Sequence, residues 1–334
     1  SQSNTTNEKI QGYSAFLSGL YQTHTDIGRW LLDLLLDDEN VCVKRRGAGL
    51  NISPILQQAV NRDLAILERL AVLDSAGLKE ALQIDDLFLE WKGADWTWGE
   101  VQLTSEYASF LKKLPTQGYG IWARHYAFTL SDGLPRPVAH PDPQSLSHLF
   151  GYERQRESIR QNIEAFLRGK AWQNMLLYGD AGTGKSSTIK AFAKEYAPSG
   201  LRIIEVPKNQ LGRLPAFIET LGENPLKFIL FIDDLTFSQV DDDFTALKTT
   251  LEGGLLSQGN NVVVFATTNR RHLVKESYGE RLGEPLYVND GLQETMGLAS
   301  RFGLNIIFEA PKKQEYTFIV ESLAKEKGIK MPLE

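Results

Sequence analysis

The stretch Gly179-Asp180-Ala181-Gly182-Thr183-Gly184-Lys185-Ser186 decides the fold expected for this chain of 334 residues. It satisfies the pattern G-x-x-x-x-G-K-[ST], in which glycines allow a tight turn and successive backbone N–H groups point at phosphate oxygens. An apolar run precedes it, and the following segment favours a helix, whose N-terminus also attracts an anion. This context disfavours the alternative, a glycine-rich turn with a chance lysine. We expect Gly179 to Ser187 to bind phosphates, with Lys185 reaching the β- and γ-phosphates and Ser186 binding Mg²⁺.

Five short apolar runs indicate the sheet to which this loop belongs. They alternate with helix-forming segments, and most are apolar on both faces, which is typical of a parallel sheet covered by helices on each side. The runs are 174–178, 201–206, 227–232, 261–266 and 304–308. The expected fold class is α/β, a P-loop NTPase with a parallel five-stranded sheet and flanking helices.

Two acids follow the third run. Asp233 is expected to hold Mg²⁺, largely through water, because Mg²⁺ keeps much of its hydration shell. Asp234 is then placed to orient or deprotonate an attacking water. Pairs of acids after an apolar run often only cap a turn. The position of this pair on the third run, 48 residues after Lys185, favours the metal-binding interpretation.

Two further side chains are candidates because of their position at the ends of the runs. Asn269 follows the fourth run, and the carboxyl ends of strands are where α/β proteins bind ligands, so it could position the water or contact the γ-phosphate. Arg301 precedes the fifth run and could stabilise transition-state charge, an effect of ~10³–10⁵ in rate where such residues act. The alternatives are a turn asparagine and a surface arginine.

The chain is expected to divide into domains at a segment rich in proline. Apolar residues at helical spacing in the first part predict a mainly helical N-terminal domain, 1–135. Four prolines and one glycine between Asp132 and Pro143 cannot sustain a helix or a central strand, so we place a linker at 136–148. The P-loop core is then 149–311, and it is followed by 312–334, for which the family resemblance given below implies the start of a helical lid.

Composition restricts the class of protein. A hydrophobic content of 42% and a charged content of 23% are ordinary for a soluble globular chain. The net charge of -6 argues against a surface that coats nucleic acid but leaves a local basic groove open. The single cysteine, Cys42, fits a reducing compartment and a small buried side chain. No signal-peptide region follows the polar start, and the apolar stretch 30–36 contains Asp33, so we expect a cytoplasmic protein without a membrane span.

With its four motifs in order, the chain from Leu146 to Gly328 resembles the AAA+ ATPases, and it looks most like the bacterial family called domain of unknown function 815. The family-specific stretches are Thr268-Asn269-Arg270-Arg271-His272-Leu273 and Arg301-Phe302-Gly303-Leu304, while the P-loop is shared with many other families. These two runs lie within the matching stretches 266–273 and 300–304, and the other matching stretches are Leu149-Phe150-Gly151-Tyr152-Glu153, 179–187 and 231–235.

The resemblance implies roles that spacing alone does not indicate. Leu149, Phe150, Gly151 and Tyr152 would line the adenine pocket of bound ATP or ADP, and Asn269 would be the residue called sensor 1. Arg301 would be an arginine finger acting in trans on ATP held by a neighbouring subunit. That role requires self-association as a ring, a filament or a transient dimer.

The chain departs from the AAA+ pattern in two places. Many AAA+ proteins have Asp-Glu where this chain has Asp233-Asp234, and the shorter second acid reaches less far toward the water. We therefore expect slow hydrolysis, as in the replication-initiator ATPases that use ATP as a switch. Gln314 to Lys327 is expected to form the first lid helix. No sensor 2 arginine is assignable, and the lid is expected to be incomplete in this chain.

Three functions from different classes remain open at this point. The leading one is an ATP-hydrolysing AAA+ protein whose N-terminal domain contacts an unknown protein client or regulates assembly. The second is a slowly hydrolysing, ATP-switched protein that binds or loads DNA, with Lys44-Arg45-Arg46 or Arg270-Arg271 as basic contacts, although the acidic composition disfavours it. The third is a P-loop small-molecule kinase, in which Arg301 would act on the nucleotide of its own chain.

Several other groups have ordinary structural interpretations that we prefer. Lys44-Arg45-Arg46 is expected to be a solvated loop. The tryptophans at 91, 96 and 98 are expected to lie in a core rather than to stack on bases. Asp241-Asp242-Asp243 is expected to cap a helix over 244–256 rather than to bind a second metal.

Overall fold

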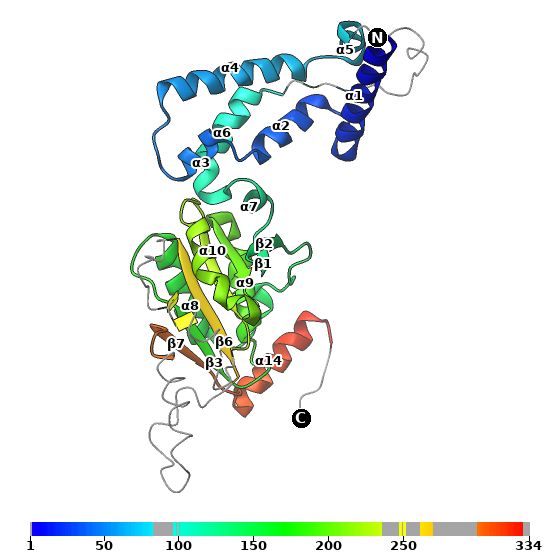
Figure 1. Cartoon of the computed structure of the whole chain (residues 1–334). Coiled ribbons are helices and arrows are strands. Elements are labelled where there is room, and N and C mark those ends of the chain that lie inside the picture. The colour runs from blue at the N-terminus through cyan, green and yellow to red at the C-terminus, as the bar shows by residue number, and fades with distance from the viewer. Residues whose placement is uncertain are drawn as a thin grey trace. The chain divides into compact units, whose positions relative to one another are not determined.

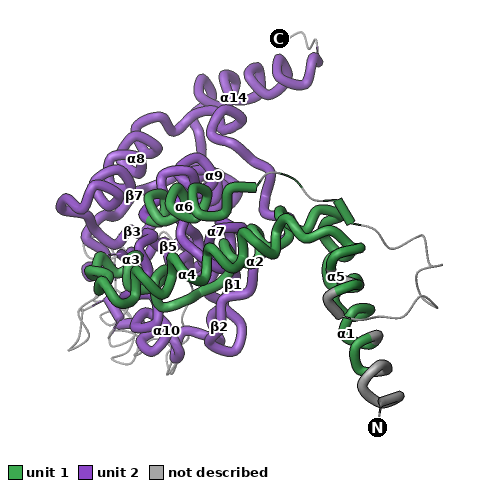
Figure 2. The backbone as a smooth tube through the Cα atoms, turned by 90° about the horizontal axis from the view of Figure 1, so that it is seen from above, with its two compact units in different colours: residues 1–114 green, residues 115–334 purple. Residues whose placement is uncertain are grey.

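The computed structural model describes residues 2–82, 96–97, 99, 101–235, 247–248, 250–251, 261–269 and 299–329. The chain forms two compact units, Ser1–Leu114 and Pro115–Glu334, which are coloured separately in Figure 2. Several predictions fall outside the described residues: the tryptophans at 91 and 98, the three acids at 241–243, most of the helix at 244–256, and Arg270-Arg271.

Unit 1 is built from helices (Figure 1). Side chains cap three of them, because the first N–H groups of a helix have no partner within it. Asp26 accepts from the backbone N–H of Arg29, Asn40 from that of Val43, and Ser53 from that of Leu56. The helices are α1 (Gln2–Thr23), α2 (Ile27–Asp37), α3 (Val41–Gly47), α4 (Pro54–Ala71), α5 (Ser75–Leu82) and α6 (Leu103–Gln117), the last of which continues into unit 2.

Several side chains of unit 1 test predictions that were made from the sequence. Trp96 is buried, donates from Nε1 to the carbonyl oxygen of Leu73 at 2.9 Å and packs edge-on against Phe16, so it is a core residue as predicted. Cys42 is buried as well. The run Lys44-Arg45-Arg46 is not a loop, because it forms the last turn of α3. Basic side chains are favourable there, close to the negative end of the helix dipole.

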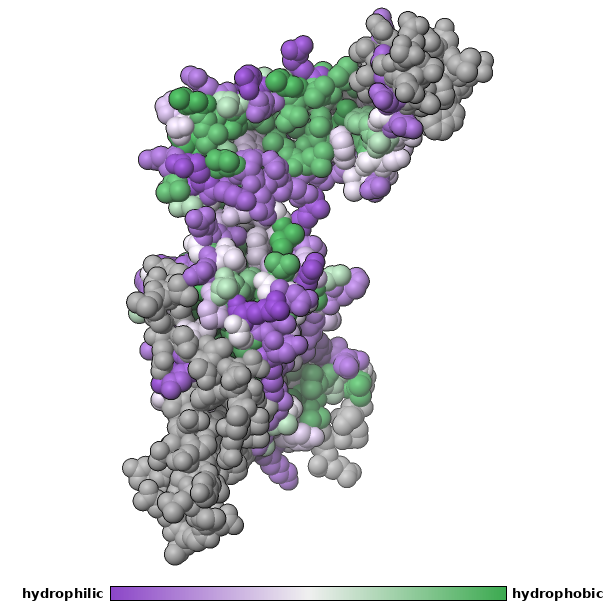
Figure 3. All heavy atoms as spheres, in the orientation of Figure 1, coloured by the Kyte–Doolittle hydropathy of each residue, from purple (hydrophilic) through white to green (hydrophobic). Residues whose placement is uncertain are grey.

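Large apolar side chains also remain exposed on unit 1. They include Leu34 on α2 and Ile55, Ile66 and Leu70 on α4, and Figure 3 shows hydrophobic residues gathered over part of this unit. None of the described helices of the chain combines the length and the apolar composition that crossing a bilayer requires.

Unit 2 contains a seven-stranded sheet with the order β2-β1-β4-β5-β6-β3-β7. The five predicted strands are all present as β3 to β7, and neighbours among them pair in parallel. The expectation of a five-stranded sheet is wrong, because β1 and β2 extend it beyond β4. The strands are β1 (Ala127–Ser131), β2 (Leu134–Pro137), β3 (Met175–Gly179), β4 (Leu201–Glu205), β5 (Lys227–Ile232), β6 (Val262–Thr268) and β7 (Leu304–Phe308).

The two additional strands form a hairpin from the segment that we had divided between the helical domain and the linker. Asp132 and Gly133 have φ values of 52° and 75° and make the two-residue turn, as is typical of a type I′ hairpin. Val138 donates its N–H to Ala127, so residues at even positions of β2 bond to β1. At Pro135 and Pro137 a backbone N–H would point away from β1, toward the open edge of the sheet. The lack of an N–H in proline therefore removes no hydrogen bond between β1 and β2.

This hairpin also moves the domain boundary. We had expected the helical domain to end at 135 and a linker to follow at 136–148. The compact units instead divide between Leu114 and Pro115, since β1 pairs in parallel with β4 and so belongs to the sheet.

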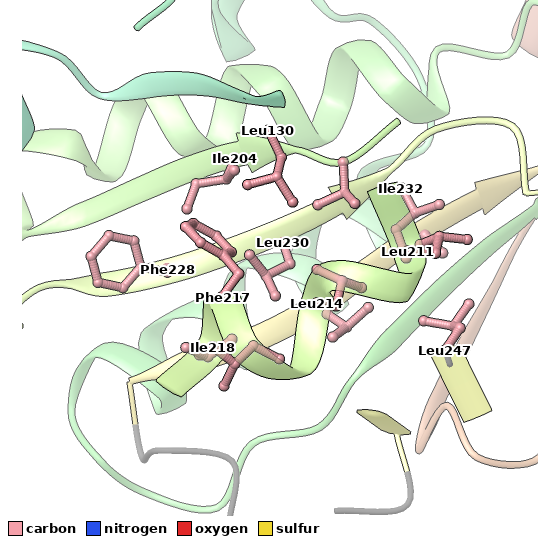
Figure 4. Close-up of a cluster of buried hydrophobic side chains, with 14 of the residues drawn as sticks. Leu130, Ile204, Leu211, Leu214, Phe217, Ile218, Phe228, Leu230, Ile232 and Leu247 are labelled. Atoms are coloured by element: carbon pink, nitrogen blue, oxygen red, sulfur yellow. The ribbon is translucent and has the colours of Figure 1, made fainter. Parts of the chain in front are cut away.

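Helices cover both faces of the sheet. Side chains from β4, β5 and β6 alternate between two buried clusters, as the period of two in a strand requires. One cluster packs against α10 (Leu214–Leu221) and the 3-10 helix η4 (Lys208–Arg213), and Leu130 of β1 joins it (Figure 4). The other packs against α8 (Glu153–Leu167) and α9 (Lys185–Tyr196). The remaining described helices of unit 2 are α7 (Ile121–Arg124), η2 (Leu146–His148), η3 (Ala197–Ser199) and α14 (Lys313–Glu326).

Arg202 on β4 ties the connection after α6 to the sheet. Its guanidinium is buried, and burial lowers its pKa to about 10. A buried charge is tolerated only when its donors are satisfied. Arg202 donates to the carbonyl oxygens of Gln117, Trp122, Ala197 and Leu201 at 2.8 to 3.0 Å. Three of these carbonyls lie in α7, in η3 and at the last residue of α6, so one side chain bonds three helical segments to β4.

We expect Arg202→Met to lower the free energy of unfolding by about 3 kcal/mol, because methionine leaves the buried carbonyl oxygens without a donor. Urea unfolding of the full chain measures the change. Arg168→Met is the control, since Arg168 is exposed and pairs only with Glu164 one helical turn away. It should cost less than about 1 kcal/mol. Equal losses in the two variants would contradict the role given to Arg202.

Candidate nucleotide-binding site

The P-loop connects the end of β3 to the start of α9. Gly179 has a φ of 131°, and a Cβ there would collide with the backbone of Phe308 on β7. Gly182 and Gly184 have φ values of 76° and 82°, which side chains rarely adopt, but a Cβ at either would meet no atom within 4 Å. The first glycine is therefore required by packing. The other two are required by the turn of the loop, which leaves open space beside them.

Lys185 lies inside this loop. Its side chain is buried, and Nζ donates to the carbonyl oxygens of Gly179 at 3.1 Å and Asp180 at 2.7 Å. Burial lowers the pKa of Lys185, and the carboxylates of Asp180, Asp234 and Asp233 oppose that shift. The negative charge of these three acids favours the protonated, cationic form of Lys185.

Asp233 and Ser186 come together at the carboxyl edge of the sheet. The Ser186 hydroxyl donates to Asp233 Oδ1 at 2.6 Å, although the two residues lie on α9 and directly after β5. Carboxylate and hydroxyl oxygens are hard ligands of the kind that Mg²⁺ takes in small number while keeping water. The described residues contain no group of three or more His, Cys, Asp or Glu side chains that could hold a metal. This pair fits a magnesium ion that is shared with substrate phosphates.

Asp234 has a φ of 50°, a left-handed backbone conformation that residues other than glycine seldom adopt. Aspartate tolerates the left-handed region better than most residues. This conformation turns the Asp234 side chain toward Asn269, whose Nδ2 donates to Asp234 Oδ1 at 3.2 Å. The two predicted residues therefore meet, and both are exposed at the same edge of the sheet as the P-loop.

Arg301 is not brought to this group of residues. It precedes β7, and Leu304 at the start of β7 pairs with Met175 at the start of β3. The P-loop begins at Gly179, which pairs with Phe308 at the other end of both strands. Five residues of strand, at about 3.3 Å each, separate the two edges by roughly 16 Å. Arg301 therefore lies at the sheet edge opposite to the P-loop of its own chain.

The segment from Leu149 to Tyr152 lies against the end of β7 and against α14. Tyr152 donates its hydroxyl to the carbonyl oxygen of Glu309 at 2.6 Å, and its ring packs on Phe308. Burial raises the pKa of Tyr152, and the carboxylates of Glu315 and Asp180 add to the rise. A Cβ at Gly151 would contact Ile319 of α14. The predicted adenine-lining residues thus share one neighbourhood with Asp180, the end of β7 and the start of α14. The structure also contains a hydrogen bond from Arg156 to the carbonyl oxygen of Leu149.

Asp180, a predicted phosphate-binding residue, makes a contact that the sequence does not indicate, and Thr267 is a residue of the site that was not among the predicted functional residues. The carboxylate of Asp180 accepts from the N–H of Ala310 at 2.6 Å, which links the P-loop to the chain leaving β7. The hydroxyl of Thr267 donates to Asp233 Oδ1 at 2.6 Å. In the sequence, Thr267 directly follows the fourth apolar run and lies in the stretch 266–273 that carries the family resemblance. Its contact with Asp233 depends on β5 and β6 being neighbours in the sheet.

A family model described as "Protein of unknown function (DUF815)" matches residues 122–334 of the chain. The chain belongs to the DUF815 family. The resemblance stated from the motifs is therefore confirmed, and the match begins close to the boundary between the two units.

The DUF815 chain is also similar to curated proteins. It is 27% identical over 162 residues to the 26S proteasome regulatory subunit 6B homolog of Schizosaccharomyces pombe, covering 40% of this chain and 41% of that protein. It is 38% identical over 55 residues to the replication factor C large subunit of Methanococcus maripaludis, covering 16% of this chain and 11% of that protein. The chain spans less than half the length of these relatives.

Solved structures resemble the DUF815 chain more loosely. The Thermotoga maritima RuvB Holliday junction branch migration motor matches with a TM-score of 0.35 and 20% identity, over 57% of this chain and 56% of that one.

We expect two glycines of the DUF815 P-loop to respond differently to alanine. Gly179→Ala should lower the melting temperature by several degrees, because the new Cβ forces β3 away from β7. Gly182→Ala should cost only about 1 kcal/mol for its left-handed backbone but weaken nucleotide binding, since the Cβ enters the open space beside the loop. Thermal melts and titration with ATP measure the two effects.

The control is Gly212→Ala, which also meets no atom within 4 Å and lies in η4, away from the loop. It should change neither quantity. Equal melting temperatures for the Gly179 and Gly182 variants would contradict the division between packing and binding.

Proposed function

We propose that this chain binds ATP with Mg²⁺ and hydrolyses it, and that the nucleotide state changes its conformation or its assembly. The proposal rests on one observation above others. The P-loop lysine, the Ser186 hydroxyl and the Asp233 carboxylate converge at the end of β3, with Ser186 and Asp233 only 2.6 Å apart. This set offers amides and a cation to phosphates and oxygen ligands to a metal.

Each side chain has a stated part in the proposed reaction. The loop amides and Lys185 bind the β- and γ-phosphates, and Ser186 and Asp233 hold the magnesium ion. When bound, the ion neutralises charge that develops on the phosphate oxygens. Asp234 accepts a proton from the attacking water while Asn269 holds the Asp234 carboxylate in place. The water oxygen bonds to the γ-phosphorus as the bond from that phosphorus to the β–γ bridging oxygen breaks, and ADP and phosphate leave.

Self-association is the second element of the proposal. Arg301 stands at the edge opposite to its own P-loop, which supports action on ATP held by a second copy. A guanidinium placed in this way supplies transition-state charge only when two copies meet. The printed names of the two curated relatives, each a subunit, agree with an assembly. Leu149 to Tyr152 are assigned to the adenine, and residues 312–334 to the start of the lid.

The alternatives receive less support from the described residues. A kinase in which Arg301 acts on its own nucleotide is disfavoured by the roughly 16 Å of strand between them. A slowly hydrolysing, DNA-binding switch differs from our proposal in rate and in partner, and binding of DNA with ATP and with ADP across a salt series distinguishes the two. A protein client of unit 1 and a cytoplasmic location stay predictions.

We expect Lys185→Ala to lower ATP affinity by at least tenfold and to abolish phosphate release, because it removes the cation nearest the β- and γ-phosphates. Isothermal titration and phosphate release without any added acceptor measure the two effects. Lys194→Ala is the control, because Lys194 lies on the same helix and its amine donates to the carbonyl oxygen of Pro143, outside the P-loop. Unchanged ATP affinity in the Lys185 variant would sink the site assignment.

We expect Arg301→Ala to retain ATP affinity but to lower phosphate release by about 10³-fold. Mixing this variant with Lys185→Ala should restore part of the activity, since each copy supplies what the other lacks. Light scattering with and without ATP and Mg²⁺ follows assembly in the same samples, and Arg168→Ala serves as an exposed arginine control. Failure of the mixture to regain activity while the copies associate would rule out action in trans.

A further inference from the structure

Thr267 is a buried hydroxyl at the centre of the proposed site. It lies near the end of β6, and its side chain is almost wholly inaccessible to solvent. Val263 and Phe265 of the same strand belong to the cluster that packs against α8 and α9. By the period of two in a strand, Thr267 faces the same side as α9, the helix that carries Ser186. A polar group at such a position has to be hydrogen-bonded, and its partners show what it does.

The Thr267 hydroxyl donates its one proton to Asp233. The distance from Oγ1 to Asp233 Oδ1 is 2.6 Å, the same as the distance from the Ser186 hydroxyl to that oxygen. Two hydroxyl donors, one on a strand and one on a helix, therefore fix the rotation of one carboxylate. Because short hydrogen bonds to a carboxylate are strong ones, Asp233 is held in one orientation by the fold itself.

The hydroxyl oxygen of Thr267, which donates to Asp233, also accepts a hydrogen bond from the backbone of Asp234. The backbone N–H of Asp234 donates to Thr267 Oγ1 at 2.9 Å, and the N–H of Leu235 donates to the Thr267 carbonyl oxygen at 2.6 Å. These bonds hold the chain at the point where Asp234 adopts its positive φ. A left-handed backbone persists only where its surroundings over-determine it. The hydrogen bonds to Thr267 help to hold Asp234 in this conformation, in which the Asp234 side chain contacts Asn269.

We propose that Thr267 is a positioning residue that fixes both acids of the site, orienting the Asp233 carboxylate for the metal and the Asp234 backbone for the water. This inference rests on the proposed function for its catalytic consequence, but the hydrogen bonds that carry it join groups of this chain alone. Thr267 bonds to Asp233 and to the backbone of Asp234, and it acts through these two residues. Partners of this kind carry about 10- to 100-fold in metal affinity or activity.

Thr267→Val tests the inference because valine keeps the branched shape and removes the hydroxyl. Thr267→Ser restores the hydroxyl without the methyl group. The matched control is Thr268→Val, since Thr268 is the next residue of β6, is equally buried and faces the opposite side of the sheet. All three variants are made in the full chain, and their melting temperatures are compared first. If Thr267→Val is unfolded at the assay temperature, Thr267→Ala replaces it.

The first measurement uses protein without nucleotide or metal. Amide hydrogen exchange of residues 231–235 should be about tenfold faster at Asp234 in Thr267→Val than in the wild type, because that N–H loses its acceptor. Thr267→Ser should exchange at the wild-type rate, and Thr268→Val should leave Asp234 unchanged. Wild-type exchange at Asp234 in Thr267→Val would overturn the inference.

The second measurement separates metal from nucleotide. Thr267→Val should need about 10- to 100-fold more Mg²⁺ for half-maximal phosphate release. Its affinity for ATP in the presence of a chelator should match the wild type, because the loop amides and Lys185 are unchanged. Thr267→Ser should return the Mg²⁺ requirement to within about threefold. Two outcomes would indicate that Thr267 is merely structural. One is a lower rate in Thr267→Val with an unchanged Mg²⁺ requirement, and the other is a raised Mg²⁺ requirement that Thr267→Ser does not restore.

The two measurements also separate this inference from the proposed function. If the wild type releases no phosphate under any condition, the proposed function fails, and the exchange rate of Asp234 alone decides whether Thr267 fixes the acids. If the wild type hydrolyses ATP and the exchange rates do not differ, the function stands and the role of Thr267 is wrong.

Discussion

The parallel order of the sheet is the constraint on which the site depends. Because β6 lies between β3 and β5, three strands that are far apart along the chain deliver their carboxyl ends to one edge. The P-loop follows β3, and Asp233 and Asp234 follow β5. Thr267 and Asn269 lie at the end of β6. No segment by itself holds both Ser186 and Asp233. The 2.6 Å contact between Ser186 and Asp233 exists because the strand order makes it.

A second set of contacts connects this edge to the chain that leaves the sheet. Asp180 of the P-loop accepts from Ala310, while Tyr152 and Gln155 donate to the carbonyl oxygens of Glu309 and Ile307. The end of β7 is therefore held by side chains from the loop and from the start of α8. Since α14 follows directly, a change in the loop has a short path of hydrogen bonds to that helix. The coupling that we propose between nucleotide state and conformation would act along this path.

Much of the fold was predictable because its signals are local. The five parallel strands are short, apolar on both faces and separated by helices, and each was placed within two residues of its observed bounds. The hairpin of β1 and β2 was missed because Pro135 and Pro137 were interpreted as excluding any strand. They exclude a central strand only, and β2 is an edge. The turn residues Asp132-Gly133 carried the opposite signal, which outweighs the prolines once the strand is at the edge.

The sequence by itself determined the chemistry of the site: glycines, a lysine and a serine at fixed spacing, and acids after a buried run. Those features are local, so the backbone near each residue suffices to express them. Only the tertiary structure decided that Thr267 bonds to both acids, that Asp180 reaches Ala310 and that Arg301 stands at the far edge. Each of these facts depends on which strands are neighbours and in what register. Strand pairing joins residues distant in the chain, and a single sequence states no partner for them.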